Sequence, residues 1–381
     1  SPSSRDLFAI WGEWWHIHAC DQSSRPMEAR GPRISMRKRT LTAGLAALLL
    51  AVGIGNAIAE ESAPVTTIAS AVYLGDVPTM VAEERGFFAD HDIQAEVTHQ
   101  ASGVLSMAKL RAGEADFALM ALTPFVIDRL ADENPGGPDD PVILASLVHS
   151  TGLMQIVARD DSGIRQPADF RGRRIAVERG TNSEFVWWLF EQYHGIARAS
   201  IELVDLSFAE MSDALMAGRI DAAVLVEPRV SKLTARLNED SQSGAVRFRV
   251  DNIYVSKWIL VTTRRTAQER RELCRRMLSA YRKAIEYIDL EADESIAIFN
   301  ERMGVTEGLL AEHWDALDYQ LALDWGLIAA LQKQFLWGQT VGYGNAGGSL
   351  RILDLIEPGP LREVDPDAVR LPRTEPAKRA P

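Results

Sequence analysis

The segment Gly180-Thr181-Asn182-Ser183-Glu184 gathers several hydrogen-bonding side chains where an expected strand gives way to an expected helix. The free N–H groups and the dipole of a helix N-terminus favour an anion at this position. Thr181, Asn182 and Ser183 can add side-chain hydrogen bonds to such a ligand. Thr181 and Glu184 also have the spacing of a capping box, which would start the helix without preventing binding. We therefore predict that Thr181, Asn182 and Ser183 contact a ligand, with plain helix capping as the alternative.

Four residues nearer the N-terminus stand at comparable strand ends. Ser102 and Gly103 follow one strand and open a helix, and a glycine there lets a ligand approach the backbone closely. Tyr73 and Asp76 follow the first strand of the chain. Because open α/β sheets bind ligands at the carboxyl ends of their strands, we predict that all four residues line a cleft.

A sequence motif that occurs twice, called the repeated phrase below, explains why two sets of strand ends are expected. Residues 110–124 read LRAGEADFALMALTP, and residues 215–228 read LMAGRIDAAVLVEP. Each copy predicts a helix stopped by its glycine, a turn, a buried strand and a proline. Asp116 and Asp221 are interpreted as turn-capping residues in preference to catalytic ones. The repetition indicates two similar α/β lobes facing one cleft.

The residue before the proline differs between the two copies, and this difference bears on ligand choice. Thr123 ends the strand of the first copy, and Glu227 ends that of the second. A carboxylate in the cleft would pair with a ligand cation such as an amine and repel a simple dianion, and Asp76 could act likewise. The alternative for Glu227 is a solvated loop carboxylate. Thr151, between two expected hinge strands, is a further predicted ligand contact.

The alternation of strands and helices predicts an α/β fold with two Rossmann-like lobes joined by a two-strand hinge. A strand region at 246–265 is expected to return the chain to the first lobe, and Trp258 within it is a weaker candidate for lining the cleft. Trp187 and Trp188 are expected in packing positions. The expected boundaries are 60–150 for lobe one, 151–250 for lobe two, 251–350 for the return and C-terminal helices, and 351–381 for a disordered, Pro- and charge-rich tail.

The N-terminal region has the three parts of a secretory signal over residues 36–59. A basic segment after Met36 precedes an apolar run, and a small-residue box ends at Ala59. Residues 1–35 are interpreted as a disordered, non-native upstream extension. We expect cleavage after Ala59, no lipid anchor because no cysteine follows the box, and residence in the periplasm. Cys274 would be the sole cysteine after cleavage and is interpreted as a buried thiol.

The charge balance restricts the possible partners. The chain of 381 residues has a formal net charge of −12. Such an acidic chain lacks the basic surface of a nucleic-acid binder, so no nucleic acid is expected as a partner.

Four motifs carry a family resemblance: YLGDVP (73–78) with AEERGFF (82–88), LRAGEADFAL, ADFRGRRIAVERGTNSE (168–184) and LMAGRIDAAVLVEP. The chain resembles the periplasmic substrate-binding proteins of ABC importers, in the group that binds sulfonates, taurine, nitrate or thiamine-pyrimidine precursors. The resemblance implies a type II periplasmic binding protein, with extra C-terminal helices on lobe one, that closes on a small ligand. It also implies a monomer that docks on an inner-membrane permease with its ATPase, without catalysis, cofactor or metal.

Other functions are possible on the same fold. A periplasmic sensor for a membrane kinase would share the cleft. A pyrimidine-synthesis enzyme of this superfamily uses a Cys-rich iron motif, which this chain lacks. None of the predicted cleft residues is an arginine, although Arg229 follows Glu227 and Pro228, and arginine is the usual clamp for a sulfonate. An amine-bearing acid or a nitrogen heterocycle therefore fits as well as a plain alkanesulfonate.

Overall fold

The computed structural model describes residues 64–133, 135–239, 244–304, 308, 311–344 and 351–372. The expected signal at 36–59, its cleavage after Ala59 and the extension at 1–35 lie outside the described residues. Within the described ranges, no helix combines the length and the apolar character that crossing a membrane requires.

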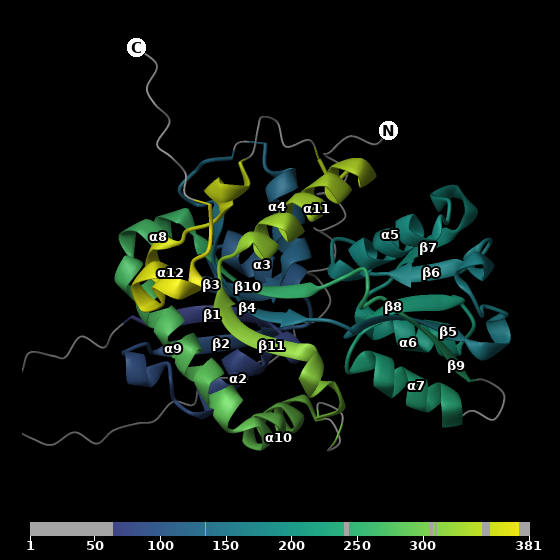
Figure 1. Cartoon of the computed structure of the whole chain (residues 1–381), viewed down its shortest axis with the longest axis horizontal. Helices are drawn as coiled ribbons and strands as arrows, with labels where there is room; N and C mark the ends of the chain where they lie inside the picture. The colour runs from purple at the N-terminus through teal and green to yellow at the C-terminus, as the bar shows by residue number, and fades with distance from the viewer. Residues whose placement is uncertain are drawn as a thin grey trace, which may run out of the picture. The chain divides into compact units, whose positions relative to one another are not determined.

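The first lobe is built on a six-stranded sheet with the order β11-β4-β10-β3-β1-β2 (Figure 1). Three of its strands, β1, β2 and β3, are parallel, and the buried runs of β1 and β3 are typical of strands covered on both faces. The strands are β1 (Thr66–Ala71), β2 (Ala95–Gln100), β3 (Phe117–Ala121), β4 (Pro141–Ser150), β10 (Ser256–Thr263) and β11 (Leu317–Ala322). Its early helices are α2 (Val77–Glu84), α3 (Gly103–Arg111) and α4 (Leu122–Ala131).

The second lobe repeats this plan on a five-stranded sheet with the order β7-β6-β8-β5-β9. Its strands are β5 (Met154–Arg159), β6 (Arg174–Val177), β7 (Glu202–Asp205), β8 (Ala222–Val226) and β9 (Ala245–Arg249). Its helices are α5 (Asn182–His194), α6 (Phe208–Met216) and α7 (Arg229–Glu239). In each sheet antiparallel pairings extend the three parallel strands, through β10, β4 and β11 in the first sheet and through β5 and β9 in the second.

The chain crosses between the sheets twice, from β4 to β5 and from β9 to β10. The strand region predicted over 246–265 contains two strands, β9 and β10, separated by a turn. The N–H groups of Ile253 and Tyr254 both donate to the carbonyl oxygen of Val250, which turns the chain between two strands. β9 therefore belongs to the second sheet and β10 to the first.

The two copies of the repeated phrase form the same turn in both lobes. Asp116 Oδ2 accepts a 2.9 Å hydrogen bond from Thr67 N, and Asp221 Oδ2 accepts one of 2.8 Å from Arg174 N. Each aspartate N–H also donates to the carbonyl oxygen of the same partner residue. The glycine of each copy has positive φ, as expected of a helix stop. Both aspartates therefore hold the turn against the neighbouring strand, a structural role that differs in its partner from the predicted capping of the turn itself.

The later helices cover the first lobe. They are α8 (Arg264–Glu269), α9 (Arg271–Leu290), α10 (Ala292–Met303), α11 (Trp325–Val341) and α12 (Gly359–Val364). The buried side of α9 packs against α2, α10 and α12 (Figure 1). Cys274 on that side is fully buried, and burial raises the pKa of its thiol to about 12.

The expectation of disorder from residue 351 onward is wrong for 351–372. Ile356 forms a β-bridge with Ile143, and Val369 forms one with Leu323. Leu361 on α12 is fully buried. Proline and charge dominate the composition of this segment, but its spaced apolar side chains suffice to hold it on lobe one. Residues 373–381 lie outside the described residues.

Candidate functional site

A small pocket lies between the two lobes, at the carboxyl ends of both sheets. Its enclosed volume is about 10 Å³, on the order of one water molecule, so the lobes are in contact around it. The first lobe contributes Ala71, Tyr73, Ser102, Gly103, Ala121, Pro124 and Trp258, and the second contributes Thr181, Asn182, Phe208 and Val226. The pocket therefore lies where the repeated architecture predicts a shared cleft.

Two helix N-termini from opposite lobes meet at this pocket. α3 begins at Gly103 after Ser102, and α5 begins at Asn182 after Thr181. The Thr181 hydroxyl caps its helix by accepting a 3.2 Å bond from Ser183 N, whereas the Ser102 side chain makes no capping bond. The first N–H groups of each helix lack carbonyl partners within their helix. Both helix ends thus present donors and partial positive charge to the same space.

Gly103 has a packing role that the sequence argument missed. A Cβ atom at this position would lie 2.9 Å from Met120 Cβ and 3.0 Å from Pro124 Cγ. The glycine therefore lets α3 approach β3 and α4 closely. Its place at the pocket wall follows from that packing.

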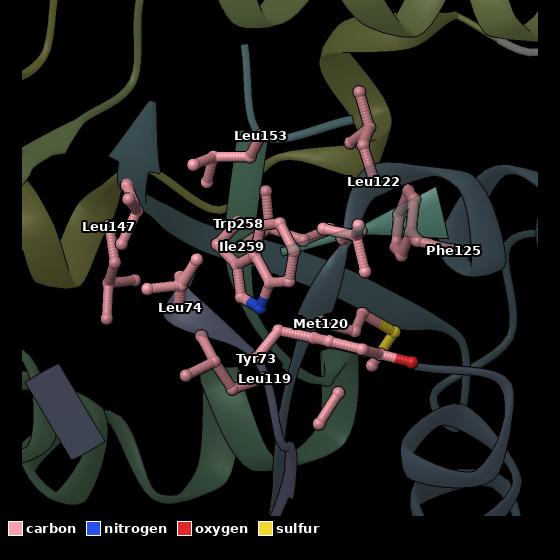
Figure 2. Packing of buried hydrophobic residues seen from close by; sticks show 14 of the residues in the cluster. Tyr73, Leu74, Leu119, Met120, Leu122, Phe125, Leu147, Leu153, Trp258 and Ile259 are labelled. Carbon is pink, nitrogen blue, oxygen red and sulfur yellow. The ribbon is translucent and has the colours of Figure 1, made fainter. Parts of the chain in front are cut away.

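Three aromatic rings form the apolar part of the pocket. The Tyr73 and Phe208 rings come from opposite lobes and meet edge to face, with centroids 5.9 Å apart. The Trp258 ring lies 6.0 Å from that of Tyr73, and Figure 2 shows the indole nitrogen directed toward Tyr73. Trp258 is 2% exposed, and its Nε1 has no hydrogen-bond partner within the described part of the chain. The indole N–H is a buried donor in the pocket wall.

Asp76 lies in the interior of lobe one, away from the pocket lining. Its carboxylate accepts a hydrogen bond from Ser70 and lies 3.2 Å from His99 Nδ1, and Glu83 holds the other ring nitrogen at 3.2 Å. Burial raises the pKa of Asp76, and the His99 contact opposes that shift. The hydrogen bond to Asp76, followed by that to Glu83, raises the pKa of His99 to about 10. The predicted ligand contact by Asp76 is not supported by this placement.

Glu227 is also absent from the pocket lining, and the solvated-loop alternative is wrong because the residue is fully buried. Its Oε2 accepts a 3.1 Å hydrogen bond from Ser231 N. Its Oε1 lies 3.2 Å from His313 Nε2, as an ion pair without the alignment of a good hydrogen bond. The Glu227 contact raises the pKa of His313. The carboxylate expected to recognise a ligand amine already has a cationic partner.

Three other predicted contacts lie elsewhere. Thr123 is fully buried in the first turn of α4. The Ser183 hydroxyl donates a 3.0 Å hydrogen bond to the Val224 carbonyl. Thr151 is an exposed hinge residue, and its N–H donates to the carbonyl oxygen of Ala316. Five of the ten predicted residues remain at the pocket, namely Tyr73, Ser102, Gly103, Thr181 and Asn182.

The pocket also contains residues that the sequence argument did not select. Phe208 follows Ser207 at the start of α6, so the same strand-end rule would have found it. Trp258, a weaker candidate from sequence, lines the pocket, whereas Trp187 is fully buried in lobe two. Among the residues that the structure describes, no group of three His, Cys, Asp or Glu side chains has an arrangement suited to a metal ion.

Curated relatives are similar to this chain at low sequence identity. A provisionally named binding protein of Brucella abortus (strain 2308) is 22% identical over 267 residues, covering 69% of this chain and 78% of its own. A provisionally named aliphatic sulfonates-binding protein of Bacillus subtilis (strain 168) is 24% identical over 274 residues, with the same coverage.

Solved structures show the same fold. The periplasmic aliphatic sulphonate binding protein of Escherichia coli is similar with a TM-score of 0.64 at 16% identity, covering 77% of this chain and 98% of its own. The desulfurization enzyme DSZB is similar with a TM-score of 0.56 at 16% identity, covering 78% and 98%. The two-lobed periplasmic-binding-protein fold therefore occurs in a binding protein and in an enzyme.

The family follows from a direct match of the sequence. The family described as NMT1/THI5 like matches residues 76–294, more than half of the chain. That range includes all four quoted motifs except residues 73–75 of the first. The chain belongs to the NMT1/THI5-like family.

Proposed function

We propose that the chain is a solute receptor of an ABC uptake system, which captures a small anionic or polar organic molecule between its two lobes. The observation that carries the proposal is the meeting of the α3 and α5 N-termini at one pocket. The relatives named as binding proteins, one of them for aliphatic sulfonates, support it. The receptor acts as a periplasmic monomer, exported by residues 36–59, and delivers its ligand to a membrane permease with its ATPase.

The lining chemistry favours a negative group on the ligand. Two helix N-termini, the Ser102 hydroxyl and the buried Trp258 N–H all offer hydrogen-bond donors. None of the eleven described residues that line the pocket is a carboxylate, and Asp76 and Glu227 are paired elsewhere. A sulfonate or carboxylate head therefore fits this lining better than an amine does. Nitrate and a pyrimidine precursor stay within the range to be screened.

Catalysis is not part of this proposal. The residues that line the pocket include no histidine, cysteine or carboxylate that could act as a general base or nucleophile there. The buried thiol of Cys274, with its raised pKa, lies on α9 and is a poor nucleophile. The lining supports a binding role over the activity of the desulfurization enzyme that shares the fold.

A thermal-shift screen tests the proposal. Sulfonates, amino-sulfonates, nitrate, pyrimidines and carboxylates are compared, and one anionic class is expected to raise Tm saturably. Asn182→Ala and Trp258→Phe should each weaken that ligand by about tenfold, the loss of one good hydrogen bond to a charged group. Asn252→Ala, on the exposed turn before β10, is the matched control and should bind as the parent does. No saturable shift from any class, or wild-type binding by both pocket variants, would contradict the proposal.

A further inference from the structure

Arg229 lies against the two aromatic rings that close the pocket. Its Cζ is 5.2 Å from the centroid of the Tyr73 ring and 5.7 Å from that of the Phe208 ring. Because Tyr73 belongs to lobe one and Phe208 to lobe two, the guanidinium contacts both sides of the interlobe contact. It is half-buried at this position.

The guanidinium has no polar partner of its own within the described residues. No hydrogen bond or ion pair is formed by Arg229, although a guanidinium carries five N–H donors. Burial raises the pKa of the Glu178 carboxyl, and its bond from Phe208 N and the nearby charge of Arg229 oppose that shift, but Glu178 and Arg229 form no ion pair. The other arginine of α7, Arg236, differs because it pairs with Asp213.

The position of Arg229 along its helix is unfavourable without an anion. Arg229 is the first residue of α7, where the helix dipole adds positive potential. A cation is normally placed at the opposite end of a helix. The potential around Arg229 is therefore positive from two sources, and the rings' electron-rich faces and the nearby Glu178 carboxyl offset it only in part.

Two places for negative charge thus lie on either side of an aromatic surface, one in the pocket and one beside it at Arg229, which does not itself line the pocket. The inner place is made by the N-termini of α3 and α5 and the unpartnered Trp258 N–H. The outer place is the guanidinium of Arg229. Tyr73 and Phe208 lie between them, line the pocket and touch the guanidinium. Separation of the two rings on ligand entry would free the guanidinium from at least one ring face.

We propose that Arg229 is a specificity-determining residue that binds a second anionic group of the ligand. The ligand class is then a two-headed dianion, such as a sulfonate that also carries a carboxylate, with a short or flat apolar segment between the rings. This inference rests on the proposed receptor function and narrows its ligand class.

Matched pairs of compounds test the second anionic group by isothermal titration calorimetry. Propane-1-sulfonate is compared with 3-sulfopropanoate, and benzenesulfonate with 4-sulfobenzoate. In the wild type, the dianion of at least one pair should bind about tenfold or more tightly than its monoanion, the effect of one charge-assisted, bidentate contact. Arg229→Gln should remove this preference while changing monoanion affinity by less than about threefold. Arg236→Gln, on the same helix, should keep it.

Charge reversal sharpens the test. 3-Aminopropane-1-sulfonate carries a cation where 3-sulfopropanoate carries its carboxylate, and Arg229→Glu should reverse the order of these two ligands. Monoanion binding without a dianion preference, or an equal loss of both in Arg229→Gln, would overturn the role of Arg229 and leave the receptor proposal standing. Failure of all these anions to bind would overturn both.

Discussion

Asp76 and Glu227 are the two carboxylates that the sequence places at strand ends facing the cleft, and the structure gives both of them a histidine instead. Each is fully buried, and each lies 3.2 Å from a histidine nitrogen. The Asp76–His99 pair lies within lobe one. The Glu227–His313 pair joins lobe two to η6 (Ala311–Ala316), the segment that leads into β11 of the first sheet. The same chemistry therefore serves as a scaffold in one place and as an interlobe contact in the other.

The scaffold pair should show the largest effect on stability. His99→Ala would leave the Asp76 carboxylate buried with hydroxyl partners alone, and we expect a loss of about 3 kcal/mol in the free energy of unfolding. Urea denaturation followed by circular dichroism measures this loss. The double variant Asp76→Ala/His99→Ala should recover part of it, because no buried charge then remains. A loss below about 1 kcal/mol in His99→Ala would show that Asp76 does not depend on the pair.

The interlobe pair should affect ligand binding more than stability. Glu227→Gln weakens the contact that favours closure, so we expect a loss of about three- to tenfold in affinity, equal for ligands with and without an amine. Calorimetry with the best sulfonate of the screen and its amino analogue measures the two losses. A selective loss for the aminated ligand would restore the sequence-based role of Glu227 as an amine receptor and remove the contrast with Asp76.

The two histidine–carboxylate pairs should also lose their stabilising effects at different pH values. The pKa of His313 is raised chiefly by Glu227 and further by Glu312, while burial and Arg247 oppose the shift. A raised pKa means that the stabilisation is complete below the unfolded value of about 6.5 and is lost as pH rises through the folded pKa. We expect ligand affinity to fall by a few-fold over that rise.

The same titration distinguishes the pairs. His313→Gln should make affinity nearly independent of pH over this range, and its ligand-free stability should keep the parent's pH profile near pH 10. Stability from the His99 pair is lost only as pH rises through about 10. An unchanged pH dependence of affinity in His313→Gln would show that another group controls closure.

The repeated elements could be predicted from sequence because local patterns determine them. The glycine of each repeated phrase follows a helix end with positive φ, and Thr181 caps the start of α5, as the sequence predicts. Ser102 and Thr181 line the pocket because strand ends and helix starts can be located from apolar runs and capping residues.

The misplaced residues depend on contacts that are distant in sequence. His313 lies far along the chain from Glu227, and no local sequence pattern pairs them. The sequence therefore suggested that the Glu227 carboxylate was available to a ligand. Thr123 points inward because the chain passes directly from β3 into α4. The C-terminal segment is ordered by bridges to Ile143 and Leu323, which its own composition does not reveal. Sequence patterns therefore located the strand ends but not the partners of the side chains there.

Amide hydrogen exchange of the ligand-bound chain tests the central claim most directly. If a ligand is held between the N-termini of α3 and α5, first-turn amides at 103–105 and at 182 and 184 gain hydrogen-bond acceptors together, whereas Ser183 N already donates to Thr181. Exchange at saturating sulfonate, followed by fragmentation and mass spectrometry, should slow at both sites by about tenfold or more. Slowing in one lobe alone, or at neither helix start while the ligand is bound, would contradict a site shared by the two lobes.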